Sequence, residues 1–100
     1  MKKYKIRISP RAYRDLNEIF EYIALEKLFP QNAKEQTNRK KEKIKTLEIF
    51  PQSHQERVEG RYAKKGYRQL LIDNHVAIFR IDEENLFVYI VTIQYQGRDI

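Results

Sequence analysis

The stretch Leu86-Phe87-Val88-Tyr89-Ile90-Val91-Thr92-Ile93 is apolar on both of the faces that a β-strand presents. Successive side chains of a strand point to opposite faces, so a strand of this kind is covered on both sides. We therefore expect residues 86–93 to lie centrally in a sheet. Helices are expected to cover one face, and something else, such as a partner protein, the other.

Two more strands are predicted immediately before this one. Residues 67–72 and 75–81 have the composition and period of strands, and short polar turns separate the three segments. The turns at 73–74 and 82–85 consist of Asp, Asn and Glu, and Asp and Asn tolerate a left-handed backbone. Residues 67–93 are therefore expected to form an antiparallel meander.

The N-terminal part predicts a strand followed by a helix. Residues 3–8 alternate between cations and the apolar side chains of Tyr4, Ile6 and Ile8, as a half-buried strand requires. Ser9 then supplies a helix N-cap hydroxyl, and Pro10 occupies the first helical position. Apolar residues recur at helical spacing after it, so the first helix is expected over residues 10–27.

A second helix is predicted over residues 33–50, which contain neither glycine nor proline, and Pro51 ends it. Its apolar stripe is thin, with Ala33, Ile44 and Leu47 facing inward. It should therefore pack against the first helix as an antiparallel hairpin, with a cationic side in solvent. Residues 51–65 show no periodicity and are expected to form a polar connection.

These elements predict one α+β domain over residues 1–100, because a chain of 100 residues has room for a single core. Its order is an N-terminal strand, an antiparallel two-helix hairpin and a three-stranded antiparallel meander, β-α-α-β-β-β. With no apolar segment long enough to span a bilayer and no signal peptide, the protein is expected to be cytoplasmic and not bound to a membrane.

Composition excludes several classes of chemistry. The chain has no cysteine and only two histidines, and it lacks a glycine-rich phosphate loop and a His-Glu-x-x-His motif. We therefore expect no metal, no cofactor and no covalent nucleophile. His75, beside a turn, and His54, in the polar connection, are expected to be solvated. Tyr13, Phe20 and Tyr22 are expected in the core, with a surface that faces a partner as the alternative.

The net charge of +6 is unevenly distributed. Residues 1–10 carry four basic and no acidic side chains, residues 33–45 six against two, and residues 57–68 five against one. If folding brings these tracts onto one face, the surface attracts polyanions. The alternative is that the lysines are scattered and serve only solubility.

Arginine, lysine and tyrosine side chains near the ends of the predicted strands are the candidates for chemistry on a phosphodiester. Guanidinium groups bind phosphate oxygens in a fork and stabilise charge that develops there, and a nearby lysine or tyrosine can move protons. The alternative is that they are ordinary solvated edge residues. The candidates are Arg61, Lys64, Lys65, Arg68, Tyr95 and Arg98.

Several stretches resemble the RelE/ParE superfamily of toxins from type II toxin–antitoxin systems. Residues 9–23, Gly66-Tyr67-Arg68, Phe79–Glu84 and Tyr95-Gln96-Gly97-Arg98-Asp99 are similar to segments of that superfamily, in the same order. The resemblance implies a helical hairpin packed on a small antiparallel sheet. It also implies a cognate antitoxin that wraps and neutralises the toxin, with operator DNA bound only through the antitoxin.

The resemblance leaves two targets open. RelE-like members cut ribosome-bound mRNA, and in that case Arg68, Arg98 and Tyr95 would be catalytic. ParE-like members inhibit DNA gyrase, and the long helical hairpin favours that branch. We expect mRNA cleavage on the ribosome, with gyrase inhibition as the first alternative and a non-catalytic nucleic-acid-binding module as the second. Residues expected to contact nucleic acid are Arg61, Lys64, Lys65, Arg39, Lys40 and Lys43.

Overall fold

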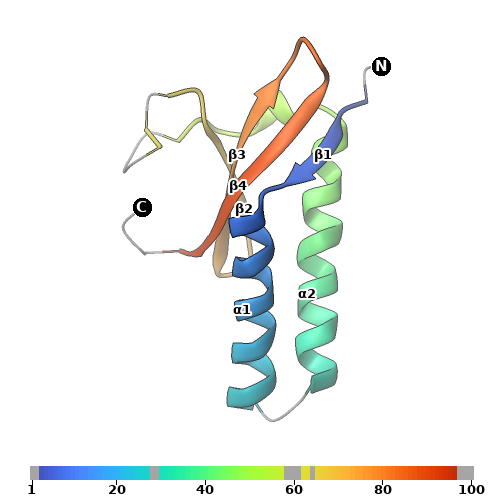
Figure 1. The fold of residues 1–100 in the computed structure, drawn as a ribbon, viewed down its shortest axis with the longest axis vertical. Helices are drawn as coiled ribbons and strands as arrows, with labels where there is room; N and C mark the ends of the chain where they lie inside the picture. Colours follow the sequence, from blue (N-terminus) through green and yellow to red (C-terminus); the bar gives the residue numbers. More distant parts are fainter. Residues whose placement is uncertain (1–2, 28–29, 58–61, 64, 97–100) are drawn as a thin grey trace.

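A helical hairpin packs against a four-stranded sheet in the computed structural model, which describes residues 3–27, 30–57, 62–63 and 65–96 (Figure 1). The elements are β1 (Lys5–Ile8), α1 (Pro10–Lys27), α2 (Pro30–Lys45), two short 3-10 helices (Thr46–Glu48 and Pro51–Ser53), β2 (Arg68–Ile72), β3 (His75–Asp82) and β4 (Phe87–Tyr95). This order confirms the β-α-α-β-β-β arrangement expected from the sequence.

Strand β4 lies inside the sheet, as its apolar sequence predicts. The strand order is β1-β4-β3-β2. Strand β1 runs parallel to β4, whereas β3 is antiparallel to both β4 and β2. The last strand of the chain is therefore bonded to the first one, and the helical hairpin connects β1 to the rest of the sheet.

The start of α1 is fixed by Ser9, which acts at two places. Its Oγ accepts a hydrogen bond from the backbone N–H of Ala12 at 3.0 Å, which is the N-cap contact expected from the sequence. The same hydroxyl donates to the carbonyl oxygen of Val91 in β4 at 2.7 Å. The helix cap is therefore also a contact with the central strand.

Asp15 of α1 also bonds to β4, beyond the point where β1 stops pairing with it. The last residue of β1 pairs with Ile90, so the following residues of β4 lack a strand partner on that side. The Asp15 carboxylate accepts the backbone N–H of Ile93 at 3.0 Å and the hydroxyl of Thr92 at 2.8 Å. A helix side chain thus satisfies backbone and side-chain donors that would otherwise remain unpaired.

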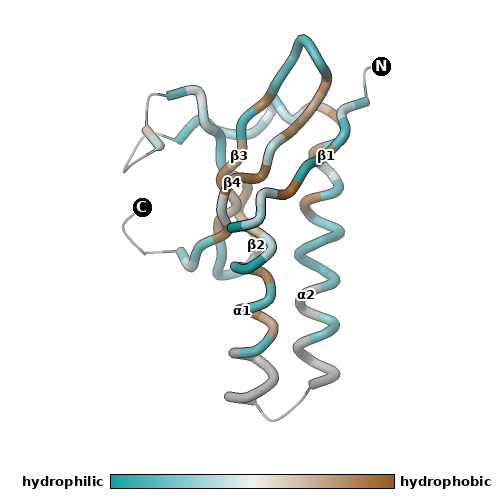
Figure 2. Tube along the Cα trace, viewed as in Figure 1, coloured by the Kyte–Doolittle hydropathy of each residue, from teal (hydrophilic) through white to brown (hydrophobic). Residues whose placement is uncertain are grey.

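The core lies between the helices and one face of the sheet, which we call the inner face. Figure 2 shows hydrophobic residues concentrated in the strands, whereas the described part of α2 is mostly hydrophilic. Ile44 and Leu47 are buried as predicted, and Ala33 lies outside the residues whose side chains are described. The buried cluster comprises Tyr4, Ala12, Leu16, Ile44, Leu47, Leu70, Ile72, Ala77, Phe79, Val88, Ile90 and Ile93.

The predicted bounds of the second helix are wrong at both ends. Helix α2 begins at Pro30, because proline suits the first turn of a helix, and ends at Lys45. The chain then tightens into a 3-10 turn that buries Leu47, and the carbonyl oxygen of Glu48 accepts the N–H of Tyr4 at 2.8 Å. A continued α-helix would not place that carbonyl beside the start of β1.

The polar connection that follows is more ordered than its sequence indicates. Gln55 and Arg57 lie beside the start of β2, where the N–H of Gln69 donates to the carbonyl of Gln55 and the N–H of Arg57 to that of Tyr67. An isolated bridge joins Glu56 to Arg68. This segment covers the beginning of the β2 edge, which a sheet would otherwise leave unpaired.

Removing the Asp15 carboxylate should loosen the hairpin from the sheet. We expect Asp15→Ala to lower the free energy of unfolding by about 2 to 3 kcal/mol, because a charged acceptor of two hydrogen bonds is lost. Urea unfolding followed by circular dichroism measures this. Glu18→Ala, an exposed carboxylate on the same helix, is the matched control and should change stability by less than about 0.5 kcal/mol. Equal effects of the two substitutions would contradict the role given to Asp15.

Candidate functional site

The nine residues proposed from the sequence fall into separate places. Arg61, Lys64 and Arg98 lie outside the described residues, so the structure describes no contact for them. Lys65 is exposed before β2. The remaining five are divided between the start of β2, the end of β4 and the helix α2.

Arg68 opens β2 and has its guanidinium in internal contacts. Its Nη1 donates to the carbonyl oxygen of His54 at 2.6 Å, and its Nη2 lies 3.8 Å from the carboxylate of Glu56. The Arg68 side chain is 25% exposed and that of Glu56 is 60% exposed. The guanidinium is therefore reachable from solvent at one side, but a carboxylate already faces it.

His54 is a candidate that the sequence did not indicate, since it was expected to be solvated. Its ring packs edge-on against buried Phe79, with centroids 5.9 Å apart. Partial burial lowers the pKa of His54, and the charges of Lys43 and Arg68 lower it further. These three side chains, which we call the Arg68 cluster, thus combine a neutral imidazole with two cations.

The contacts of the Arg68 cluster explain why the sequence missed His54. Its residues come from α2, from the segment after the second 3-10 helix, and from β2. They meet only because that segment folds back along β2, and no local period or motif marks such a contact. The only sequence signal is a histidine in a polar segment that lies between the basic tracts 33–45 and 57–68.

Tyr95 ends β4 and lies away from Arg68. It is 56% exposed, and its ring contacts that of His75 edge-on with centroids 5.3 Å apart. Tyr95 pairs with His75, which pairs with Ile72, four residues beyond Arg68 on β2. At about 3.3 Å per residue this separates the two positions by roughly 13 Å along the strands. The described fold therefore does not bring Tyr95 beside Arg68.

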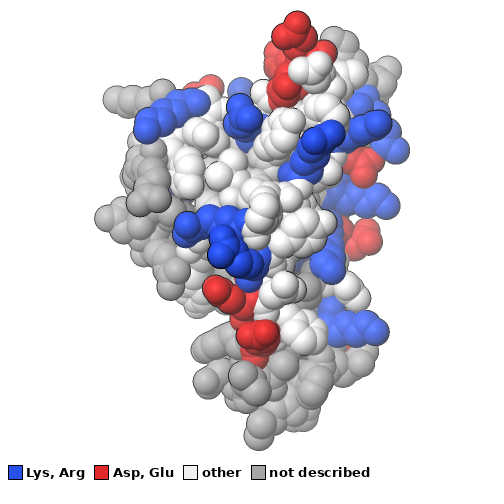
Figure 3. Space-filling model, in the orientation of Figure 1, with Lys and Arg blue, Asp and Glu red and all other residues white. Residues whose placement is uncertain are grey.

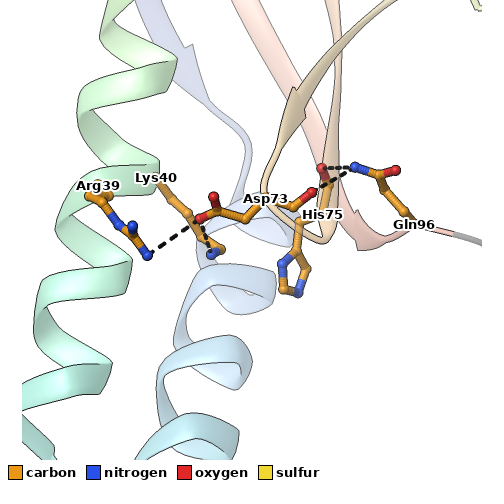
Figure 4. A network of polar contacts seen from close by, with 5 residues as sticks. All are labelled: Arg39, Lys40, Asp73, His75 and Gln96. Carbon is orange, nitrogen blue, oxygen red and sulfur yellow. Dashed lines mark hydrogen bonds and ion pairs between the residues drawn. The ribbon is translucent and has the colours of Figure 1, made fainter.

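The cations of α2 differ sharply in accessibility. Lys40 is only 1% exposed, and its Nζ lies 3.6 Å from the carboxylate of Asp73 in the β2–β3 turn. Arg39 reaches the same carboxylate at 3.6 Å, with a side chain that is 67% exposed (Figure 4). Lys40 is thus placed where no polyanion can contact it, whereas Arg39 and Lys43 are on the surface.

His75 belongs to the same network and is not the exposed turn histidine that the sequence suggested. It is half-buried, and its Nδ1 is buried without a hydrogen-bond partner among the described residues. Burial lowers the pKa of His75, the charge of Lys40 lowers it further, and Asp73 opposes these effects. Beside it, Gln96 Nε2 donates to the carbonyl oxygens of Asp73 and His75 (Figure 4). The imidazole is therefore held neutral beside a buried ammonium.

The aromatic residues of α1 that were expected in the core differ in burial. Tyr13 is 56% exposed, so its expected place in the core was wrong, whereas Phe20 is half-buried. The side chain of Tyr22 lies outside those that the structure describes.

The basic residues that the structure describes do not gather on one surface. Figure 3 shows Lys and Arg side chains at several separate places on one face, with acidic residues over the β3–β4 turn and farther down over the hairpin. The cations on this view do not merge into a single continuous patch.

The described residues contain no group of three or more His, Asp or Glu side chains that could hold a metal ion. None of the helices, as far as they are described, is long and apolar enough to cross a membrane.

Comparisons with known proteins agree on the architecture. Residues 6–100 match the family described as the ParE toxin of the type II toxin–antitoxin system, parDE. No curated protein matches the chain in sequence. Among solved structures, a chromosomal ParDE system from P. aeruginosa superposes with a TM-score of 0.76 at 20% identity, covering 93% of this chain and 96% of that one.

Two further solved structures are similar in fold. A RelBE toxin–antitoxin complex from Mycobacterium tuberculosis gives a TM-score of 0.62 at 18% identity and covers 94% of this chain and 99% of that one. An archaeal RelE–RelB complex from Pyrococcus horikoshii gives 0.61 at 16% identity, covering 96% and 98%. At these identities the likeness establishes the RelE/ParE-like fold.

The buried ammonium next to His75 provides a direct test of this polar network. Lys40→Met should raise the pKa of His75, because the substitution removes a positive charge that disfavours protonation while keeping the volume filled. An NMR titration of the imidazole Cε1 proton measures the change. Lys41→Met, on the exposed side of α2, removes the same charge and should leave the titration of His75 nearly unchanged. A shift of equal size in both variants would contradict the proximity of Lys40.

Proposed function

Because the chain belongs to the ParE toxin family of type II toxin–antitoxin systems, we propose that it arrests bacterial growth by binding and inhibiting DNA gyrase. It is a toxin of the RelE/ParE superfamily, a group whose members act on different targets. The proposal is that this toxin acts by occupying its target, without breaking a covalent bond.

The internal contacts of the Arg68 guanidinium are the observation that favours gyrase inhibition over mRNA cleavage. A RelE-like nuclease needs an arginine at this position that is free to bind the scissile phosphate and its developing charge. Here Nη1 is held by the carbonyl of His54 and Nη2 faces Glu56. A phosphate that binds both Nη groups in a fork would have to compete with the carbonyl of His54 and approach the carboxylate of Glu56, and both requirements weaken binding.

Exposed apolar side chains support an inhibitor that works by binding. Protein interfaces draw most of their energy from a few aromatic and apolar anchors that become desolvated. Tyr13 on α1 and Phe50 between the 3-10 helices are 56% and 60% exposed, and Ile49 beside Phe50 is 49% exposed. A catalytic role would not require such residues at the surface, whereas a docked partner protein would bury them.

Ribosome-dependent mRNA cleavage is the second candidate, and His54 is the observation that favours it. A neutral imidazole can accept the proton of a ribose 2′-hydroxyl, and adjacent cations can stabilise the charge on phosphate. Lys43 and Arg68 lie close enough to lower the pKa of His54. In this proposal Arg68 clamps the phosphate and Arg98 assists, whereas Tyr95 lies too far from Arg68 along the strands to act on the same phosphate. Flanking phosphates are held by Arg61, Lys64, Lys65, Arg39 and Lys43.

We also propose a cognate antitoxin as the physiological partner. The three similar solved structures are described as toxin–antitoxin systems or complexes. Half-buried Phe87 and Tyr89 on the face of β4 opposite the helices, together with exposed Leu71 on β2, leave apolar surface for a wrapping segment to cover. Operator DNA would then be contacted through the antitoxin rather than by this chain.

Parallel assays separate the two targets. We expect the purified chain to inhibit supercoiling by gyrase, with Arg68→Ala active within about twofold of the wild type, because Arg68 already makes internal contacts. Transcripts in cells that express the chain should stay uncut. Arg14→Ala, an exposed arginine on α1, is the control for loss of one positive charge.

Normal supercoiling together with ribosome-dependent transcript cuts would favour mRNA cleavage over gyrase inhibition. The cuts should then decrease about 10²- to 10⁴-fold in His54→Ala, as expected when a general base is removed. Circular dichroism of His54→Ala and Arg68→Ala must match the wild type for the comparison to hold. Normal growth on expression of the wild-type chain would overturn both proposals.

A further inference from the structure

The sheet face opposite the helices carries a row of alternating cations and aromatic rings. On this outer face Arg7 of β1 pairs with Tyr89 of β4, and Tyr89 pairs with Arg80 of β3. Paired residues on neighbouring strands point to the same side of a sheet, so these three side chains lie next to one another. Lys5 and Phe87 occupy the adjacent positions of β1 and β4. We call these five residues the outer-face row.

The rings and cations of the outer-face row are already stacked. The guanidinium carbon of Arg7 lies 4.3 Å from the ring centroid of Phe87, and that of Arg80 lies 4.9 Å from the ring centroid of Tyr89. The two rings are 6.0 Å apart and tilted by 45°. Each guanidinium thus has one face on a ring, and the exposure of Arg7 and Arg80 leaves these groups accessible to a ligand.

The cations of this row are not neutralised by ion pairs. Lys5, Arg7 and Arg80 are all exposed, and within the described parts of the chain none of them forms a salt bridge. This differs from Arg39, Lys40 and Arg68, which each face a carboxylate. Asp82 lies opposite Phe87 at the end of β3, beside the acidic turn; hydrogen bonds from Asn85 lower the pKa of its carboxyl, and the charge of Arg80 lowers it further without forming a salt bridge. A ligand of negative charge therefore fits the row and is repelled from the turn.

We propose that the outer-face row binds single-stranded nucleic acid, with bases stacked on the Arg–aromatic pairs and phosphates held by the three cations. Single strands expose the flat faces of their bases, which stack on aromatic rings and on guanidinium planes. A sheet with helices on one side only can offer such a platform on its other side. A duplex hides the faces of its bases within the stack, so it cannot stack them on this row.

This site is separate from the Arg68 cluster and from the exposed side chains of Tyr13, Ile49 and Phe50, but it shares Phe87 and Tyr89 with the surface proposed for the antitoxin. Arg68 pairs with Phe79, which belongs to the inner-face core, whereas Arg80 is the next residue of β3 and points to the outer face. A binding assay with purified components therefore does not depend on gyrase inhibition or on mRNA cleavage. Absence of oligonucleotide binding would contradict only the proposed site, and normal gyrase supercoiling would contradict only the proposed function.

Fluorescence anisotropy with a labelled uridine 12-mer, its DNA counterpart and a 12-base-pair duplex tests the proposal on the full chain made by cell-free synthesis. We expect the single strands to bind more tightly than the duplex, and the tighter of the two identifies RNA or DNA as the ligand. Three phosphate contacts would lower single-strand affinity about 20-fold between 50 and 200 mM salt. Tyr89→Leu should weaken binding about 5- to 150-fold, whereas Tyr89→Phe should restore it.

A charge-matched pair of double variants separates the row from general basicity. Arg7→Ala with Arg80→Ala should weaken binding about 10-fold or more and reduce the salt dependence to about one phosphate contact. Lys34→Ala with Lys41→Ala removes the same charge from exposed positions of α2 and should weaken binding less than about threefold. The proposal is overturned if both pairs lose affinity equally, if Tyr89→Leu binds like the wild type, or if the duplex binds more tightly.

Discussion

Strand β4 is hydrogen-bonded along both of its edges, and the arrangement of every other element depends on this. One edge is paired with β3 from Phe87 to Tyr95, with a single register shift between Ile78 and Phe79. The other is paired with β1 as far as Ile90, after which the hydroxyl of Ser9 and the carboxylate of Asp15 take over. Because unpaired buried backbone groups are costly, this substitution of side chains for a missing strand fixes where the hairpin crosses the sheet. It also keeps the helices on the inner face alone.

Position in the fold gives the described cations different roles. Lys40 and Arg68 are used internally: Lys40 holds the β2–β3 turn through Asp73, and Arg68 ties β2 to the segment before it. Arg7 and Arg80, on the outer face, lie over aromatic rings and form no salt bridge among the described residues. The net charge alone therefore overstates the surface that a polyanion can reach, and position in the sheet decides which cations are available.

The sequence predicted those features that depend on local pattern. The doubly apolar segment identified the central strand, Ser9 and Pro10 identified the start of α1, and alternation identified the three C-terminal strands. Contacts between distant segments were not predictable: the burial of Lys40, the position of His54 and the pairing of residues 55–57 with β2 all require the tertiary fold. The second helix was placed wrongly because nothing local indicates that residue 48 must return to residue 4.

Native-state hydrogen exchange at the amide of Ile93 tests the central constraint most directly. If Asp15 replaces a strand partner there, this amide exchanges only when the whole domain unfolds, and its free energy of exchange equals that of the slowest amides in β3 and β4. Exchange of the Ile93 amide at a rate close to that of a solvent-exposed strand edge, while its neighbours in β4 stay protected, would contradict the account.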